Sequence, residues 1–233
     1  MIGRKVAEGQ RAAHDDRRLA GWLGFVTLFA ALAYSSNLVA DDSTVEEPLY
    51  DSSFFFASVV GLGMMVGVAL LVAVGARKRE LFALRRPRSW GRAAGISFLV
   101  LVGILVLSAA VSPFIDPGEE QGLLPDEWPP PDAAVFALNA AAVVIGAPLA
   151  EELLFRGLGY SLFERFGSVA AIVAPSAGWA AAHGLLEAFP LIFALGLGLG
   201  ILRRSSGSIV PGMILHGIFN ALALAAAAAS ASS

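Results

Sequence analysis

The chain contains no cysteine, which excludes disulfide bonds, thiolate catalysis and metal sites built on cysteine. Charged residues are also scarce: they make up 15% of the 233 residues, whereas a soluble domain would carry roughly a quarter. Hydrophobic residues make up 57% and lie in blocks close to the ~20 residues that are needed to cross a bilayer. The composition therefore predicts an integral membrane protein that consists of helices.

Apolar blocks divide the sequence into candidate membrane spans. The pattern predicts an all-α, polytopic transmembrane helical bundle with about seven spans, within a range of six to eight. The fifth and sixth blocks are short and interrupted by proline and glycine, and Pro148 and Pro175 are expected to kink their helices. The predicted spans are residues 21–40, 54–76, 93–115, 134–156, 168–186, 188–202 and 208–228.

The first apolar block has two interpretations. Basic residues precede it and the sequence Ala31-Leu32-Ala33 resembles a signal-peptidase site, which is the pattern of a cleaved signal peptide. The block is longer than the apolar region of a usual signal peptide, and the polar stretch before it is long. We therefore expect a retained first span.

Most basic residues lie in alternate connections. The segment before the first span holds five of the sixteen basic residues, and loop 77–92 holds seven more. The other two loops before the fourth span are acidic and contain neither Lys nor Arg. Because basic loops stay in the cytoplasm, we expect a multi-pass protein of the cell membrane with a cytoplasmic N-terminus. Loop 77–92 is expected to contact anionic lipid of the bilayer, and no nucleic-acid partner is expected.

Three charged residues lie within an apolar stretch: Glu151, Glu152 and Arg156, in the sequence AEELLFRG. If the helix continues to Arg165, the glutamates lie about 18–20 Å from its inner end, at a rise of about 1.5 Å per residue. An ionisable residue at that depth indicates a functional site, because burying its charge costs about 2.5–3.5 kcal/mol. The alternative is that these charges end the fourth span at the cytoplasmic surface.

Helical spacing distinguishes the two glutamates. Glu152 and Arg156 are i and i+4 with the acid first, which is the favourable order for an ion pair on one helical face. Glu151 points about 100° away from that face. We therefore expect a structural pair and a freer carboxylate, Glu151, that faces a polar cavity and suits the role of a general base.

Two of the three histidines lie in later apolar blocks. His183 is late in the fifth block, and His216 is in the seventh with Asn220 one turn further on the same face. A single intramembrane histidine is more often a hydrogen-bonding partner between helices than a catalyst. Two histidines, an asparagine and a carboxylate pair on three separate blocks instead indicate a buried site. His14, in the charged N-terminal segment, is expected to be solvated.

These residues resemble the motifs of the CPBP family of intramembrane proteases, which includes type II CAAX prenyl proteases and bacteriocin-processing or immunity-associated (Abi) proteins. That family carries Glu-Glu-x-x-x-Arg, Phe-x-x-x-His and His-x-x-x-Asn or Asp on separate transmembrane helices. The matching segments here are EELLFR, WAAAH and HGIFN, and Trp179 stands where the family usually has Phe. The resemblance implies a protease core at residues 134–228, preceded by a basic segment with three spans (1–133) and followed by a tail (229–233).

The resemblance also implies an activity. The protein would be an intramembrane endopeptidase that cuts a membrane-associated peptide or a prenylated protein near the cytoplasmic side. Glu151 would activate a water molecule with assistance from His183. His216 and Asn220 would orient the water or stabilise the oxyanion. The Glu-Arg pair identified above, residues 152 and 156, would hold the first motif in place.

A metal ion is compatible with these residues but not required by them. Glu151, His183 and His216 can supply three zinc ligands with an open position for water, as in a metalloprotease. No H-E-x-x-H sequence is present, and the three side chains come from distant parts of the chain. The sequence therefore leaves zinc open as a cofactor.

Two other functions are compatible with the same pattern. One is a non-catalytic membrane scaffold or bacteriocin-immunity protein, because a fold does not determine a function. The other is a proton-coupled transporter that uses a carboxylate–histidine relay.

Overall fold

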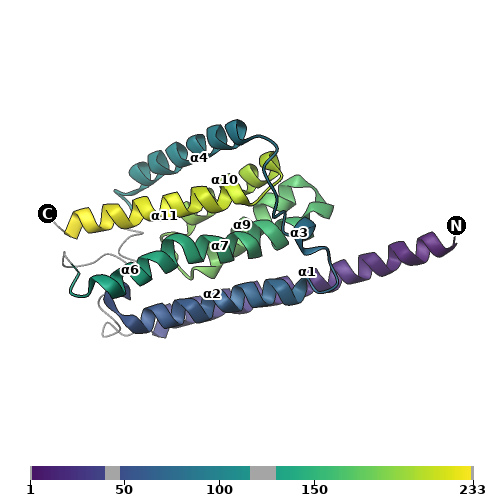
Figure 1. Ribbon diagram of the computed structural model, residues 1–233, viewed down its shortest axis with the longest axis horizontal. Helices are drawn as coiled ribbons and strands as arrows, with labels where there is room; N and C mark the ends of the chain where they lie inside the picture. Colours follow the sequence, from purple (N-terminus) through teal and green to yellow (C-terminus); the bar gives the residue numbers. More distant parts are fainter. Residues whose placement is uncertain (1, 40–47, 116–129, 232–233) are drawn as a thin grey trace.

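The computed structural model describes residues 2–39, 48–115 and 130–231. Every regular element in these ranges is helical, and these ranges contain no strand. Six helices are long and apolar enough to cross a membrane. They lie side by side in one bundle (Figure 1), so the predicted all-α membrane fold is confirmed.

The first three spans precede the charged motif. Side-chain caps explain where two of them begin: Asp51 accepts a hydrogen bond from the Ser53 backbone N at 2.8 Å, and Ser89 accepts one from the Arg92 backbone N at 3.3 Å. The elements are α1 (Ile2–Val39), the 3₁₀ turn η1 (Pro48–Tyr50), α2 (Ser52–Val72), the short helix α3 (Lys78–Leu81) and α4 (Trp90–Val111).

The fourth span is a helical column from Ala133 to Phe166, which is longer than the predicted block 134–156. The glutamate pair therefore lies inside the column, and the alternative that these charges end the span is wrong. The column alternates between helix types. Its segments are α6 (Ala133–Ala141), the π-helix η2 (Ala142–Gly146), α7 (Ala147–Glu151), the π-helix η3 (Glu152–Gly159), α8 (Tyr160–Phe163) and the 3₁₀ turn η4 (Glu164–Phe166).

The helix that forms in the predicted fifth span, 168–186, is too short to cross a membrane. This helix, α9 (Ser168–Ala182), has 15 residues, about 22 Å at 1.5 Å per residue, against the ~30 Å of a bilayer core. The chain turns at Gly184, whose φ is +70°, and a Cβ there would lie 2.6 Å from the Ala33 carbonyl carbon of α1. α9 then packs along α10 (Phe189–Ser206), and α11 (Val210–Ala231) ends the described chain.

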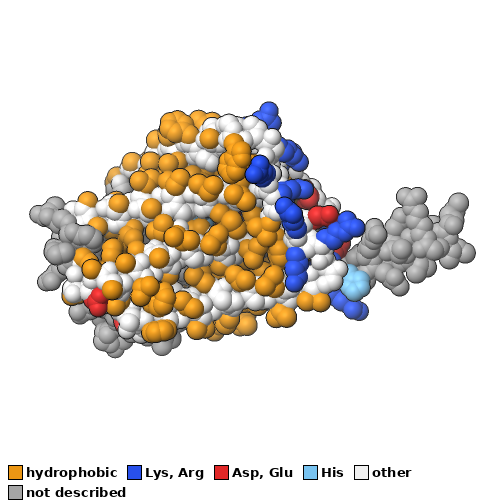
Figure 2. All heavy atoms as spheres, in the orientation of Figure 1, with side chains coloured by type: hydrophobic (Ala, Val, Ile, Leu, Met, Phe, Trp, Pro, Cys, Tyr) orange, Lys and Arg blue, Asp and Glu red, His pale blue; other side chains and the backbone are white. Residues whose placement is uncertain are grey.

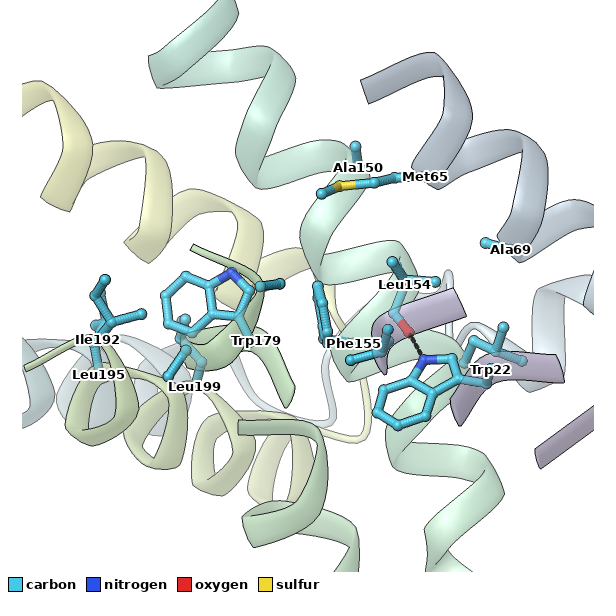
Figure 3. Packing of buried hydrophobic residues seen from close by; sticks show 14 of the residues in the cluster. Trp22, Met65, Ala69, Ala150, Leu154, Phe155, Trp179, Ile192, Leu195 and Leu199 are labelled. Atoms are coloured by element: carbon cyan, nitrogen blue, oxygen red, sulfur yellow. Dashed lines mark hydrogen bonds between the residues drawn. The ribbon is translucent and has the colours of Figure 1, made fainter. Parts of the chain in front are cut away.

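The fourth span lies between α2 and α11, while α1 packs against α9 and α4 packs against α10 and α11. Trp22 of α1 connects this arrangement to the charged motif. Its indole Nε1 donates to the Leu154 carbonyl at 3.0 Å, and its ring meets Phe155 edge to face (Figure 3). Contacts with α1 thus fix the position of the segment that follows the two glutamates.

The two ends of the bundle differ in charge. We call one of them the basic end: it comprises loop 77–92, Arg165 and the pair Arg203 and Arg204. Loop 77–92 is attached to the α10–α11 turn, where the Arg85 Nε donates to the Gly207 carbonyl at 2.7 Å. Figure 2 shows Lys and Arg side chains gathered at this end. The starts of α2 and α6 and the end of α11 lie at the opposite end (Figure 1).

Candidate active site

Glu152 and Arg156 form the buried ion pair that their spacing predicted. The Arg156 Nη1 lies 3.1 Å from the Glu152 Oε1, and the two side chains are 2% and 0% exposed, respectively. The guanidinium also lies over the Trp179 ring, 4.2 Å from its centroid. Both charges of the pair therefore lie inside the protein, away from solvent and lipid.

Two glycines on neighbouring helices leave room for this pair. A Cβ at Gly212 of α11 would lie 2.7 Å from the Glu152 Oε2. A Cβ at Gly196 of α10 would lie 3.1 Å from the Arg156 Nη2. A larger residue at either position would therefore press on one of the two charged groups, so close helix packing and the buried pair depend on each other.

Glu151 lies on the wall of a cavity of about 440 Å³. Its carboxylate accepts a hydrogen bond of 2.5 Å from the Trp179 Nε1. His216 of α11 approaches both glutamates: its Nε2 lies 3.8 Å from the Glu151 Oε2, and its Nδ1 lies 3.5 Å from the Glu152 Oε1. The two carboxylates and one imidazole thus form a compact buried cluster.

Trp179 contacts both histidines of the candidate site. Its ring meets His183 and His216 edge to face, each at a centroid distance of 5.1 Å. The His183 Nδ1 lies 2.8 Å from the Trp179 carbonyl oxygen. Because a carbonyl oxygen only accepts, this Nδ1 carries the hydrogen, and the Nε2 of the neutral ring is a proton acceptor. No carboxylate of the described residues lies within ion-pair distance of His183.

Asn220 is held by an irregular turn in the fourth span. Its Nδ2 donates to the Val143 carbonyl at 2.9 Å. In the π-helix η2 the Ala147 N–H bonds to the Ala142 carbonyl. The same register would pair Val143 with residue 148, which is proline and has no N–H. Pro148 therefore leaves the Val143 carbonyl available to the asparagine, whose second amide hydrogen can point elsewhere.

The four side chains predicted to be catalytic, those of Glu151, His183, His216 and Asn220, line the same cavity. They come from the fourth span, from the end of α9 and from α11. His14, which the sequence excluded, is exposed on α1. Most of the remaining lining is apolar and includes Phe54, Leu191, Ile192, Leu195, Phe219 and Leu224.

A protein-family comparison matches residues 133–222 to the family described as type II CAAX prenyl endopeptidase Rce1-like. This region is a domain of the Rce1-like CAAX endopeptidase family. It begins with α6 and extends into α11, so that it contains all three motifs and every charged residue of the buried cluster. Comparison with curated proteins and with solved structures gives no match.

The side chains of the CAAX endopeptidase domain do not match the three-ligand zinc site that the sequence allowed. Among the described residues, no group of three or more His, Asp or Glu side chains is arranged to hold a metal ion. His183 makes its polar contact with a backbone carbonyl, whereas Glu151 and His216 approach each other. A metalloprotease is therefore not supported, and the chemistry proposed below uses these side chains alone.

Sequence reasoning missed a buried polar residue at the start of the domain, Asn139 of α6. It is fully buried, and its Nδ2 donates to the carbonyls of Leu49 at 3.1 Å and Asp51 at 3.0 Å. Its apolar neighbours in the sequence are a usable signal, because a buried amide requires hydrogen-bond partners. Asn139 thereby fixes the start of α2 beside the fourth span, next to the cavity wall at Phe54.

Proposed function

We propose that the CAAX endopeptidase domain hydrolyses a peptide bond of a membrane-associated protein or peptide within the membrane. The observation that supports this most is the convergence of Glu151, His183, His216 and Asn220 on one cavity. A carboxylate that faces a cavity together with other polar side chains is an arrangement that can activate water for attack on a carbonyl group. Membership of an endopeptidase family supports the same reaction.

In the proposed mechanism, Glu151 takes a proton from a water molecule as the water oxygen bonds to the carbonyl carbon of the substrate. The resulting oxyanion accepts a hydrogen bond from the second amide hydrogen of Asn220. Glu151 then transfers its proton to the leaving nitrogen, the C–N bond breaks, and a carboxylic acid and an amine are released. The His183 Nε2 accepts a hydrogen bond from the same water molecule and assists its deprotonation by Glu151.

The wall of the cavity indicates the kind of segment that it binds. Apart from the catalytic groups, its lining consists largely of Leu, Ile, Phe and Ala side chains. Such a surface favours an apolar peptide segment or a lipid-modified chain, because burying apolar area contributes about 25 cal/mol per Å². Peptide and prenylated-protein substrates both satisfy this requirement.

The proposed reaction can be tested in proteoliposomes that contain the purified protein and membrane-anchored peptides, in water enriched in ¹⁸O. We expect new peptide termini by mass spectrometry, with one ¹⁸O atom in each new carboxylate. His183→Ala should lower the rate of cleavage about 10²-fold or more, because assistance by a positioned acid or base contributes about 10²–10⁴-fold.

The same vesicles test the other functions. A transporter would carry solute in response to a pH gradient and cut nothing, and a scaffold would do neither. Proton-driven flux without cleavage, or cleavage without ¹⁸O in the products, would contradict the proposal.

Trp179→Phe is expected to lower kcat about tenfold to a hundredfold while leaving KM nearly unchanged. Phenylalanine keeps an aromatic ring between the two histidines but removes the N–H that holds the Glu151 carboxylate. A hydrogen bond to a charged group contributes about 1.5–3 kcal/mol, and about 1.4 kcal/mol corresponds to a tenfold change in rate. Steady-state kinetics of the reconstituted protein would measure the effect.

Trp22→Phe is the matched control, because Trp22 also buries an indole and donates a hydrogen bond, but to the Leu154 carbonyl. We expect this variant to unfold at a lower temperature and to keep its kcat. Equal losses of kcat in both variants would show that Trp179 acts only through the stability of the fold.

A further inference from the structure

The cavity of the candidate active site occupies only one half of the bundle. Its lining residues on α11 run from His216 to Ala227, toward the C-terminal end of that helix. Those on α10 run from Leu191 to Leu195, at the start of that helix, and Leu49 lies just before α2. The starts of α2 and α6 and the end of α11, toward which this lining extends, lie at the end of the bundle opposite the basic end (Figure 1).

The half between Glu151 and the basic end is closed by packed side chains. Leu154 and Leu158 of the fourth span are fully buried, and so are Leu199 and Leu202 of α10. Trp22 of α1, at 1% exposure, packs beside Leu154 (Figure 3). Along the fourth span, Glu151 and Tyr160 are about 13 Å apart at a rise of 1.5 Å per residue. The packed side chains occupy this interval.

A second recess of about 430 Å³ opens at the basic end, and its lining includes Arg85, Arg88, Tyr160 and Arg203. None of the described residues lines both this recess and the active-site cavity. The cavity therefore extends from Glu151 toward the opposite end of the bundle, and packed side chains of the described residues separate it from the recess at the basic end.

The charge of the two ends assigns these halves to the two sides of the membrane. Basic connections remain in the cytoplasm, and loop 77–92, Arg165, Arg203 and Arg204 all belong to the basic end. The basic end therefore faces the cytoplasm, and the cavity lies in the half that faces the opposite side.

We propose that the active-site cavity opens toward the extracytoplasmic half of the membrane and receives its substrate from there. The substrate class is then an apolar segment of an exported or membrane-anchored peptide that is exposed outside the cytoplasm. A prenylated cytoplasmic tail would have to cross the packed half to reach Glu151. This inference takes its substrate from the proposed function, and it reverses the expected position of cleavage near the cytoplasmic side.

The absence of cysteine makes the side of access directly measurable, because one introduced thiol is the only thiol in the chain. Ala147 lines the cavity one turn before Glu151. We expect Ala147→Cys to react with a membrane-impermeant, cationic methanethiosulfonate at least tenfold faster in spheroplasts, where the reagent is outside, than in inside-out vesicles.

Two matched positions control this experiment. Ala150 belongs to the same helix but faces the packed core at 2% exposure, so Ala150→Cys should react from neither side. Ser168 lines the recess at the basic end, so Ser168→Cys should react only in inside-out vesicles. Reaction of Ala147→Cys only from the cytoplasmic side, or from neither side, would overturn the proposal, and so would reaction of Ser168→Cys from outside.

A second measurement separates the side of access from the reaction itself. Two single-span substrates would carry the same cleavable apolar segment, one in the outer half of the membrane and one in the inner half. We expect cleavage of the outer segment only, and cleavage of the inner segment alone would refute the access side. If Ala147→Cys reacts from outside and neither substrate is cut, the access side stands and the proposed protease function fails.

Discussion

Glu151→Gln is expected to abolish detectable cleavage, with a fall in kcat/KM of about 10²–10⁴-fold. Glutamine has nearly the same size as glutamate, and its side-chain oxygen can still accept the hydrogen bond from the Trp179 Nε1. The glutamine side chain cannot take a proton from water. The substitution therefore removes only the function of the general base. The rate would be measured with the reconstituted protein and the membrane-anchored peptide that the wild type cuts.

The control for this variant is Glu164→Gln, which makes the same chemical change at an exposed position at the end of the fourth span. It should leave both kcat/KM and the unfolding temperature unchanged. Glu151→Gln should also unfold close to the wild-type temperature, because this carboxylate forms no short ion pair with an arginine. Retention of a tenth or more of wild-type activity by Glu151→Gln would show that another group activates the water.

Arg156→Gln is expected to have the largest effect on stability, with a loss of about 3–5 kcal/mol in the free energy of unfolding. The substitution leaves the Glu152 carboxylate buried at 0% exposure without its counter-charge. Because Glu152 is fully buried, solvent cannot replace the guanidinium at that position. The unfolding temperature in detergent, or the midpoint of denaturant unfolding, would report the loss.

Arg165→Gln provides the comparison, because it makes the same substitution in an ion pair that solvent reaches. Arg165 lies 2.7 Å from Asp16, and the two side chains are 33% and 67% exposed. A surface pair contributes about 0–1 kcal/mol. The double variant Glu152→Gln/Arg156→Gln should be more stable than the sum of its single changes implies, because it leaves no unpaired charge. Equal effects at Arg156 and Arg165 would contradict a structural role for the buried pair.

These two expectations assign different tasks to neighbouring glutamates. Glu152 faces Arg156 and Gly212 of α11, where its contacts stabilise the packing. Glu151 faces the cavity and the Trp179 indole. His216 lies close to both carboxylates, so it connects the buried ion pair to the proposed general base. A change in the buried pair should therefore also disturb the position of the imidazole.

The position of the cavity also affects which substrates deserve testing first. In the proposed orientation, a peptide whose cleavage site lies outside the cytoplasm reaches the cavity without crossing the packed half around Leu154 and Leu158. A prenylated cytoplasmic tail, which the proposed function also allows, would approach from the basic end. The thiol-labelling experiment at Ala147 separates these two classes before any substrate is known.

Much of this protein followed from local features of its sequence. Hydrophobic block length indicated membrane helices, because the thickness of a bilayer sets the number of apolar residues that a helix needs. The four-residue interval between Glu152 and Arg156 predicted their ion pair, because helix geometry alone places them on one face. The order of three short motifs was enough to indicate the family, which the comparison of residues 133–222 then showed.

Other features depend on contacts between distant segments, and only the tertiary structure decided them. The hydrogen bond from Trp179 to Glu151 joins residues 28 positions apart, and that from Asn220 to Val143 joins residues 77 apart. The short α9 and the closure of one half of the bundle likewise result from how the helices pack. Composition and spacing determined which residues are polar within the membrane, while helix packing determined which of them share a cavity and toward which end it opens.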